Sequence, residues 1–130
     1  MARRRAVQAL YQGEIMDQNV NEIKLNFLED SKQAEVDHAY FYHLLEEVSN
    51  HRDSIDERLT SCLDRDLAMV DPVERAVLRL GAYELEYQTD MPTRVVLDES
   101  IEMSRIFGAE EAYRFVNGVL DRLATVLGRK

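Results

Sequence analysis

The chain has 130 residues, of which 45% are hydrophobic and 32% are charged, a balance that is ordinary for one globular domain. Folding at this length buries roughly two-thirds of the unfolded surface, so one hydrophobic core can form without disulfides or metals. No apolar run approaches the ~20 residues of a membrane-spanning helix, and the amino-terminal segment is too short and too polar for an export signal. We therefore expect a cytoplasmic protein without membrane contact, and the single cysteine, Cys62, agrees with a reducing compartment.

The formal net charge is −9, which repels RNA and other polyanions unless a local basic patch overrides it. Only one dense basic patch is visible in the sequence, and it is formed by Arg3, Arg4 and Arg5. A polyanionic partner would therefore meet a surface that is unfavourable almost everywhere else.

Apolar residues recur at intervals of three and four, while glycine and proline are scarce, so the sequence predicts helices nearly throughout. In chain order, the expected helices are Ala2–Met16, Asn21–Asp30, Asp37–Asn50, Arg52–Leu63, Pro72–Tyr87, Pro92–Phe107 and Glu110–Leu127. Residues 64–71 are the best candidate for a hinge between two helical groups. We expect one all-α domain over residues 1–130, with about seven helices in two packed three-helix sub-bundles, at about residues 1–63 and 72–130.

Several residues predict where these helices begin and end. Asn19–Asn21 supplies a loop and an N-cap for the second helix. Asp71 is expected to cap the helix that follows, because Pro72 suits the first helical position. Gly108 is expected to end the sixth helix as its C-terminal cap.

The sequence offers little chemistry of the kind that enzymes use. It contains no glycine-rich phosphate loop, no CxxC and no HExxH motif. The three histidines, His38, His43 and His51, are spaced by five and eight residues, so no adjacent pair has the i,i+4 spacing of a helical metal site. We expect no catalysis, no metal and no cofactor.

One carboxylate stands out on a helical wheel of residues 72–87. Glu74, Arg75, Arg79 and Glu86 share a polar arc, but Glu84 falls in the middle of the apolar arc. A buried, unpaired carboxylate is costly, so Glu84 should accept hydrogen bonds from an arginine, a tyrosine or a helix N-terminus. We expect a structural role, as a polar link between helices.

The last predicted helix has one wide apolar face and one polar face. Its apolar face is formed by Ala112, Val116, Val119, Leu120, Leu123 and Leu127. Gly118 lies on the polar face, where alanine would favour the helix by about 1 kcal/mol. Phe115 lies at the seam with arginines around it, a composition typical of a base-stacking platform. The alternative is that Phe115 covers the edge of the core and Gly118 accommodates a neighbouring helix.

Three segments together resemble the NusB family of bacterial transcription antitermination factors. They are RRRAVQALYQ (residues 3–12), VERAVLRLGAYEL (73–85) and MPTRVVLDESIEMSRIFGAEEAYRFVNGVLD (91–121). The resemblance implies two perpendicular three-helix bundles without catalysis. It also implies binding of boxA RNA together with the small-ribosomal-subunit protein called NusE, in support of rRNA operon transcription. Other antitermination factors and RNA polymerase would be indirect partners.

The resemblance also implies roles for individual residues. The RNA contacts would be Arg3, Arg4, Arg5, Glu111, Arg114 and Phe115, with Gly118 on the same approachable surface. Tyr11 and Glu74 would lie on the NusE side. Because the chain is acidic, we expect it to bind RNA weakly alone and more tightly when a basic partner is docked.

Two other functions stay open at this point. One is a helical protein-binding scaffold, in which the polar face of the last helix contacts no RNA. The other is the detached NusB-like RNA-binding domain of an rRNA methyltransferase, which would require a cofactor-binding half beyond this sequence.

Overall fold

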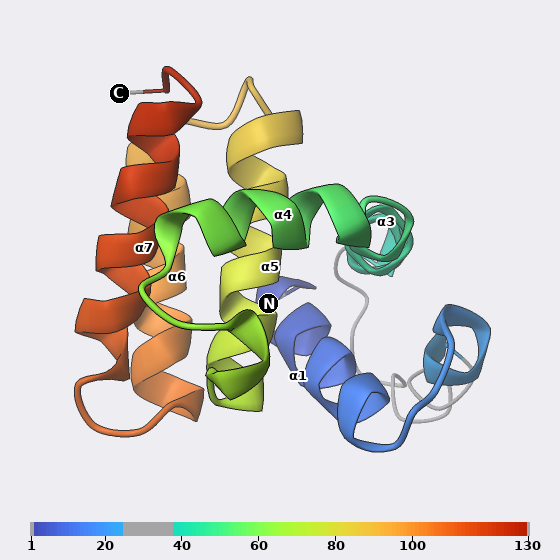
Figure 1. Ribbon diagram of the computed structural model, residues 1–130. Helices are drawn as coiled ribbons and strands as arrows, with labels where there is room; N and C mark the ends of the chain where they lie inside the picture. Colours follow the sequence, from blue (N-terminus) through green and yellow to red (C-terminus); the bar gives the residue numbers. More distant parts are fainter. Residues whose placement is uncertain (1, 25–37, 130) are drawn as a thin grey trace.

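The structure, a computed structural model, describes residues 2–24 and 38–129 (Figure 1). Its helices are α1 (Ala2–Ile15), α3 (His38–Asn50), α4 (Arg52–Cys62), the short 3₁₀ helix η1 (Leu67–Met69), α5 (Pro72–Tyr87), α6 (Thr93–Phe107) and α7 (Ala112–Val126). Residues 20–24 are also helical, whereas the rest of the predicted helix Asn21–Asp30, and Asp37, lie outside the described residues. No strand occurs in these two ranges, which confirms the all-α class. None of the helices described there has both the length and the apolar character needed to cross a membrane.

Side-chain caps begin two of the helices where the sequence predicts them. Asn19 and Glu22 exchange hydrogen bonds of 2.9 and 3.2 Å between their side chains and backbone N–H groups, forming a capping box. The Asp71 carboxylate accepts a bond of 3.0 Å from the Val73 N–H, and Pro72 begins α5. These caps satisfy backbone donors that the first turn of a helix leaves unpaired.

The predicted start of α7 is wrong, and the predicted hinge contains a short helix. α7 begins at Ala112 and not at Glu110, because Glu111 has a left-handed backbone with φ 74° that interrupts the helix. The predicted hinge 64–71 contains η1, whose Leu67 is buried together with the following Val70. These two apolar side chains fix the segment against the core, so it is a packed connection.

α5 is the central helix, and it packs against α1, α3, α4, α6 and α7 (Figure 1). All residues from 76 to 85 are buried, including the charged Arg79 and Glu84. Gly81 permits the close approach of α7, because a methyl group there would lie 2.7 Å from Leu120 Cδ1. Since α5 contacts helices from both halves of the chain, the division into two sub-bundles stays a prediction.

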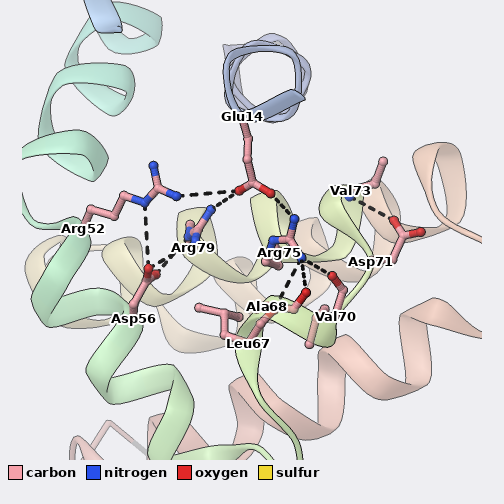
Figure 2. A network of polar contacts seen from close by, with 10 residues as sticks. All are labelled: Glu14, Arg52, Asp56, Leu67, Ala68, Val70, Asp71, Val73, Arg75 and Arg79. Atoms are coloured by element: carbon pink, nitrogen blue, oxygen red, sulfur yellow. Dashed lines mark hydrogen bonds and ion pairs between the residues drawn. The ribbon is translucent and has the colours of Figure 1, made fainter. Parts of the chain in front are cut away.

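A network of ion pairs joins α1 and α4 to the polar arc of α5 (Figure 2). Arg79 is only 8% exposed and donates to both oxygens of Asp56, at 2.9 and 3.1 Å. Arg75 and Arg79 both donate to the carboxylate of Glu14. Arg52 lies 3.8 Å from each of the same two carboxylates. The polar arc of α5 is thus covered by other helices instead of facing solvent.

Arg75 extends this network to the segment before α5. Its Nη1 donates to the carbonyl oxygens of Ala68, at 3.1 Å, and of Val70 (Figure 2). Burial alone would raise the pKa of Glu14, but the hydrogen bonds and charges of Arg75 and Arg79 outweigh it and lower that pKa. Glu14 is therefore held in its charged form as the shared acceptor of two helices.

A second polar link fixes the start of α1. Glu84 is 1% exposed and accepts hydrogen bonds from Arg3 Nε, at 2.9 and 3.2 Å, and from the Tyr40 hydroxyl, at 2.7 Å. Arg3 also donates to Met91 Sδ at 2.8 Å. Burial raises the pKa of Glu84, and Tyr40 and Arg3 oppose that rise. The link joins α1, α3, α5 and the connection between α5 and α6.

Candidate nucleic-acid interface

The polar side of α7 carries Phe115, Gly118 and Arg122 in one line, because their spacings of three and four residues place them on one helix face. Phe115 is half-buried and packs against the core. Arg65, from the segment after α4, lies over the ring with its guanidinium carbon 4.7 Å from the ring centroid. This distance is typical of a cation–π contact. We refer to the two residues as the Phe115–Arg65 stack.

Arg122 fixes the segment that carries Arg65 against α7. Its Nε donates at 3.1 Å to the carbonyl of Cys62, the last residue of α4. Figure 1 shows the end of α4 beside α7. Arg65 donates from Nε to Asp64 at 3.1 Å, and its side chain stays 50% exposed. The hydrogen bond and charge of Arg65 lower the pKa of the Asp64 carboxyl, and the charge of Arg122 contributes to the shift.

Gly118 lies on an open part of the α7 surface. Apart from its chain neighbours and the surrounding backbone of α7, a methyl group built on it would have no heavy atom within 4 Å among residues 2–24 and 38–129. The interpretation that Gly118 accommodates a neighbouring helix is therefore wrong for the described part of the chain. A glycine with no packing requirement, next to the Phe115–Arg65 stack, leaves room for close approach by a ligand.

We expect opposite stability effects from the same substitution at two helical glycines. Gly118→Ala should raise the free energy of unfolding by up to about 1 kcal/mol, because alanine favours the helix and meets no neighbour. Gly81→Ala should lower it by about 1–3 kcal/mol, because the new methyl group overpacks the contact with Leu120. Urea unfolding of both variants measures the difference, and destabilisation by Gly118→Ala would contradict the open surface.

Arg114 makes its contacts with Tyr113 and Glu111 of its own segment. It is exposed, donates from Nε to the Tyr113 hydroxyl at 3.1 Å and lies 3.8 Å from Glu111. Arg105 of α6 also lies over Tyr113, with its guanidinium carbon 4.6 Å from the ring centroid. The hydrogen bond and charge of Arg114 lower the pKa of Tyr113, with help from Arg105. Arg114 is thus engaged with Tyr113 and Glu111.

The three arginines near the amino terminus have different surroundings. Arg3 is paired with Glu84, and its side chain is only 20% exposed. The guanidinium carbon of Arg5 lies 5.7 Å from the ring centroid of Phe41. Arg4 is half-buried. The basic patch seen in the sequence is therefore reduced, because one of its three charges is neutralised inside the protein.

The two residues expected on the partner side lie on helices that touch. Tyr11 is 38% exposed, one turn before Glu14 on α1. Glu74 is half-buried, immediately before Arg75 on α5, and the Glu14–Arg75 ion pair joins the two helices. Burial raises the pKa of Glu74, the charge of Asp71 adds to the rise and the charge of Arg65 opposes it.

The described histidines pack with tyrosines. His51 stacks on Tyr87 with ring centroids 4.2 Å apart, and His43 Nε2 lies 2.9 Å from the Tyr83 hydroxyl. The side chain of His38 lies outside the described residues. Among those that are described, no group of three or more His, Cys, Asp or Glu side chains is arranged to hold a metal ion.

Sequence reasoning missed Arg65, the arginine that covers Phe115. Arg65 belongs to a connection far earlier in the chain, and helical periodicity relates only residues of one helix to one another. Its one signal was an arginine between two aspartates in the predicted hinge. Only the packing of α4 on α7 reveals the contact.

An aromatic ring beneath an arginine, beside an open helix face, is a candidate surface for binding a flat ligand. The fold that carries it is that of a small all-helical protein. Residues 1–125 match the NusB family. The chain belongs to this family, and the relatives it matches are named transcription antitermination protein NusB.

Individual relatives agree with this assignment. The chain is 43% identical over 129 residues to the transcription antitermination protein NusB of Pasteurella multocida, covering 99% of this chain and 90% of the relative. It is 46% identical over 126 residues to that of Alcanivorax borkumensis, covering 97% and 84%. The solved structure of T. maritima NusB is similar at TM-score 0.86 and 31% identity, covering 95% of this chain and 88% of that one. A crystal structure of the antitermination factors NusB and NusE in complex with double-stranded RNA matches at TM-score 0.88 and 26% identity, covering 96% and 94%.

Proposed function

We propose that the protein is a cytoplasmic RNA-binding antitermination factor that binds boxA-type RNA together with NusE, in support of rRNA operon transcription. The observation that carries this proposal is the surface of α7, where Phe115 and the open Gly118 face lie side by side. The similarity to a solved NusB–NusE complex with RNA supports the choice of partners. Arg4, Arg5, Glu111 and Arg114 are proposed as further RNA contacts.

Charge explains why RNA binding needs a second protein. The net charge of −9 opposes a polyanion, and Arg3 is already engaged with buried Glu84. Few phosphates can therefore be neutralised by this chain alone, so its affinity should be low and depend weakly on salt. A basic partner that docks on the acidic protein supplies the missing positive charge.

The partner surface is proposed around Tyr11 and Glu74. Large apolar side chains of α1 and η1 are exposed near the Glu14–Arg75 pair, namely Tyr11, Ile15 and Met69. An apolar patch with a carboxylate beside it suits a basic protein that also buries hydrophobic surface. NusE is the proposed occupant.

Replacing Phe115 tests the RNA surface. We expect Phe115→Leu, which keeps apolar contact with the core but removes the ring, to weaken binding of boxA RNA about tenfold, because it removes the aromatic platform of the surface. Fluorescence anisotropy with labelled boxA and scrambled RNA, each with and without NusE, measures this effect. NusE should strengthen binding of boxA RNA by the parent protein.

Partner binding is the internal control for this experiment. Phe115→Leu should bind NusE as the parent does, whereas Glu74→Gln should weaken NusE binding and leave the affinity of the protein alone for RNA unchanged. Equal RNA binding by Phe115→Leu and the parent would favour the protein-binding scaffold. An absence of any gain on adding NusE would reject the cooperative mechanism.

A further inference from the structure

We propose that Arg65 is a further RNA-contacting residue, whose guanidinium plane is sandwiched between the Phe115 ring and an unpaired base. The inference rests on the proposed function, because it extends the same surface. It adds a residue from the connection after α4 to a site otherwise assigned to α7 and the amino terminus.

The geometry of the Phe115–Arg65 stack favours this role. The guanidinium carbon lies 4.7 Å from the ring centroid, so Arg65 covers a face of the ring that a base would otherwise use. The side chain is nevertheless 50% exposed. A base can thus stack on the outer face of the guanidinium, as bases do on arginine planes in single-stranded RNA complexes. The hydrogen bond to Asp64 uses Nε and does not engage the two terminal amino groups.

The neighbours of the stack suit a nucleotide chain. Phe115, Gly118 and Arg122 extend over about 10 Å of α7, given a rise of about 1.5 Å per residue. The Gly118 face is open, which lets a sugar–phosphate backbone lie close to the helix. Arg122 supplies a positive charge at the far end while its Nε holds the Cys62 carbonyl. A strand stacked on Arg65 therefore has room beside it and a cation beyond it.

The charges around Arg65 determine what it offers to RNA. Asp64 pairs with it directly, and the charge of Arg65 also acts on Glu74. The Asp64 carboxylate pairs with Nε of Arg65 beside the ring and partly offsets its charge. We therefore expect Arg65 to contribute mainly through its planar stacking surface, a property that lysine does not share.

Three arginine variants separate stacking from charge. In the complex with NusE, we expect Arg65→Ala to weaken binding of single-stranded boxA RNA about tenfold. Arg65→Lys should weaken it nearly as much at high salt, where simple charge contributes least. The matched control is Arg94→Ala, which removes the same charge from an 86% exposed side chain at the start of α6. It should change binding less than twofold.

The fold and the partner contact are checked in the same variants. Arg65 is half-exposed, so thermal unfolding of Arg65→Ala should match that of the parent, and NusE should bind it unchanged. The inference is overturned if Arg65→Ala behaves as Arg94→Ala does, if Arg65→Lys restores full affinity at high salt, or if only NusE binding is lost. If Phe115→Leu weakens RNA binding and Arg65→Ala does not, this inference alone fails; if neither variant does, the proposed RNA surface fails as well.

Discussion

Arg3→Met is expected to lower the free energy of unfolding at neutral pH by about 3–5 kcal/mol, the usual result of removing one partner of a buried ion pair. Glu84 is 1% exposed and would keep Tyr40 as its hydrogen-bond donor without a balancing charge. Methionine has about the length of the arginine side chain and keeps its apolar stem, so the loss of stability measures the interaction between Arg3 and Glu84. A loss of this size is a large fraction of the roughly 5–15 kcal/mol by which a typical domain is stable.

The effect of Arg3→Met should depend on pH in a defined direction. Burial already raises the pKa of Glu84, and removing Arg3 removes one of the groups that oppose the rise. A carboxyl with a raised folded-state pKa stabilises the fold when protonated and loses that contribution as the pH rises through this pKa. The difference in free energy of unfolding between the parent and Arg3→Met should therefore shrink as the pH falls toward the ordinary glutamate pKa of about 4.3.

Two further variants identify the cause. Arg4→Met removes the same charge from the neighbouring residue, which forms no ion pair in the part of the chain that the structure describes, and should cost less than about 1 kcal/mol. Adding Glu84→Gln to Arg3→Met should recover part of the loss, since a neutral amide still accepts from Tyr40. Equal losses for Arg3→Met and Arg4→Met in urea unfolding would reject the buried pair. RNA binding by Arg3 variants must be compared at equal folded fractions.

Arg79→Met is the second substitution with a large expected effect. Arg79 donates to both oxygens of Asp56 and to Glu14, with its side chain only 10% exposed. Its loss leaves two carboxylates of neighbouring helices facing each other with weaker partners, and should lower the free energy of unfolding by about 3 kcal/mol. Because the pKa of Glu14 is lowered in the fold, its stabilisation is present above the ordinary glutamate pKa and is lost as the pH falls through the lower folded value. Chemical denaturation at several pH values measures both effects.

Arg52 provides the matched control. It approaches the same two carboxylates at 3.8 Å, but its side chain is 51% exposed. Arg52→Met should cost less than about 1 kcal/mol, as exposed ion pairs usually do. A double-mutant cycle between Arg79 and Asp56 should show coupling, whereas one between Arg52 and Asp56 should show little. Similar losses at positions 52 and 79 would mean that burial does not set the strength of this network.

The helices were predictable because their signals are local. Periodicity predicts α5 with the observed ends, and Asp71 with Pro72 predicts its capped start. The start of α7 was not predictable in the same way, because Glu111 favours a helix by propensity and its left-handed backbone follows from the turn after α6. Burial of Arg79 was missed because a wheel shows that a face is polar, and cannot show that other helices cover it with carboxylates.

The residues of the proposed site were predicted or missed for the same reason. Phe115 and Gly118 were located by the wheel because both lie on one helix. Arg65 was missed because its contact with Phe115 depends on how separate segments pack. Residues that share a helix can be predicted together from sequence, whereas residues that meet across helices require the fold.

The Phe115–Arg65 stack has a consequence for synthesis. Its two residues come from the connection after α4 and from α7, so the stack cannot exist until α7 has left the ribosome and docked on α4 and α5. Contacts between such distant segments form late relative to local helices, because closing the intervening chain has an entropic cost. A nascent chain that has made α1 to α5 therefore still lacks the proposed RNA surface, which is completed only when α7 docks.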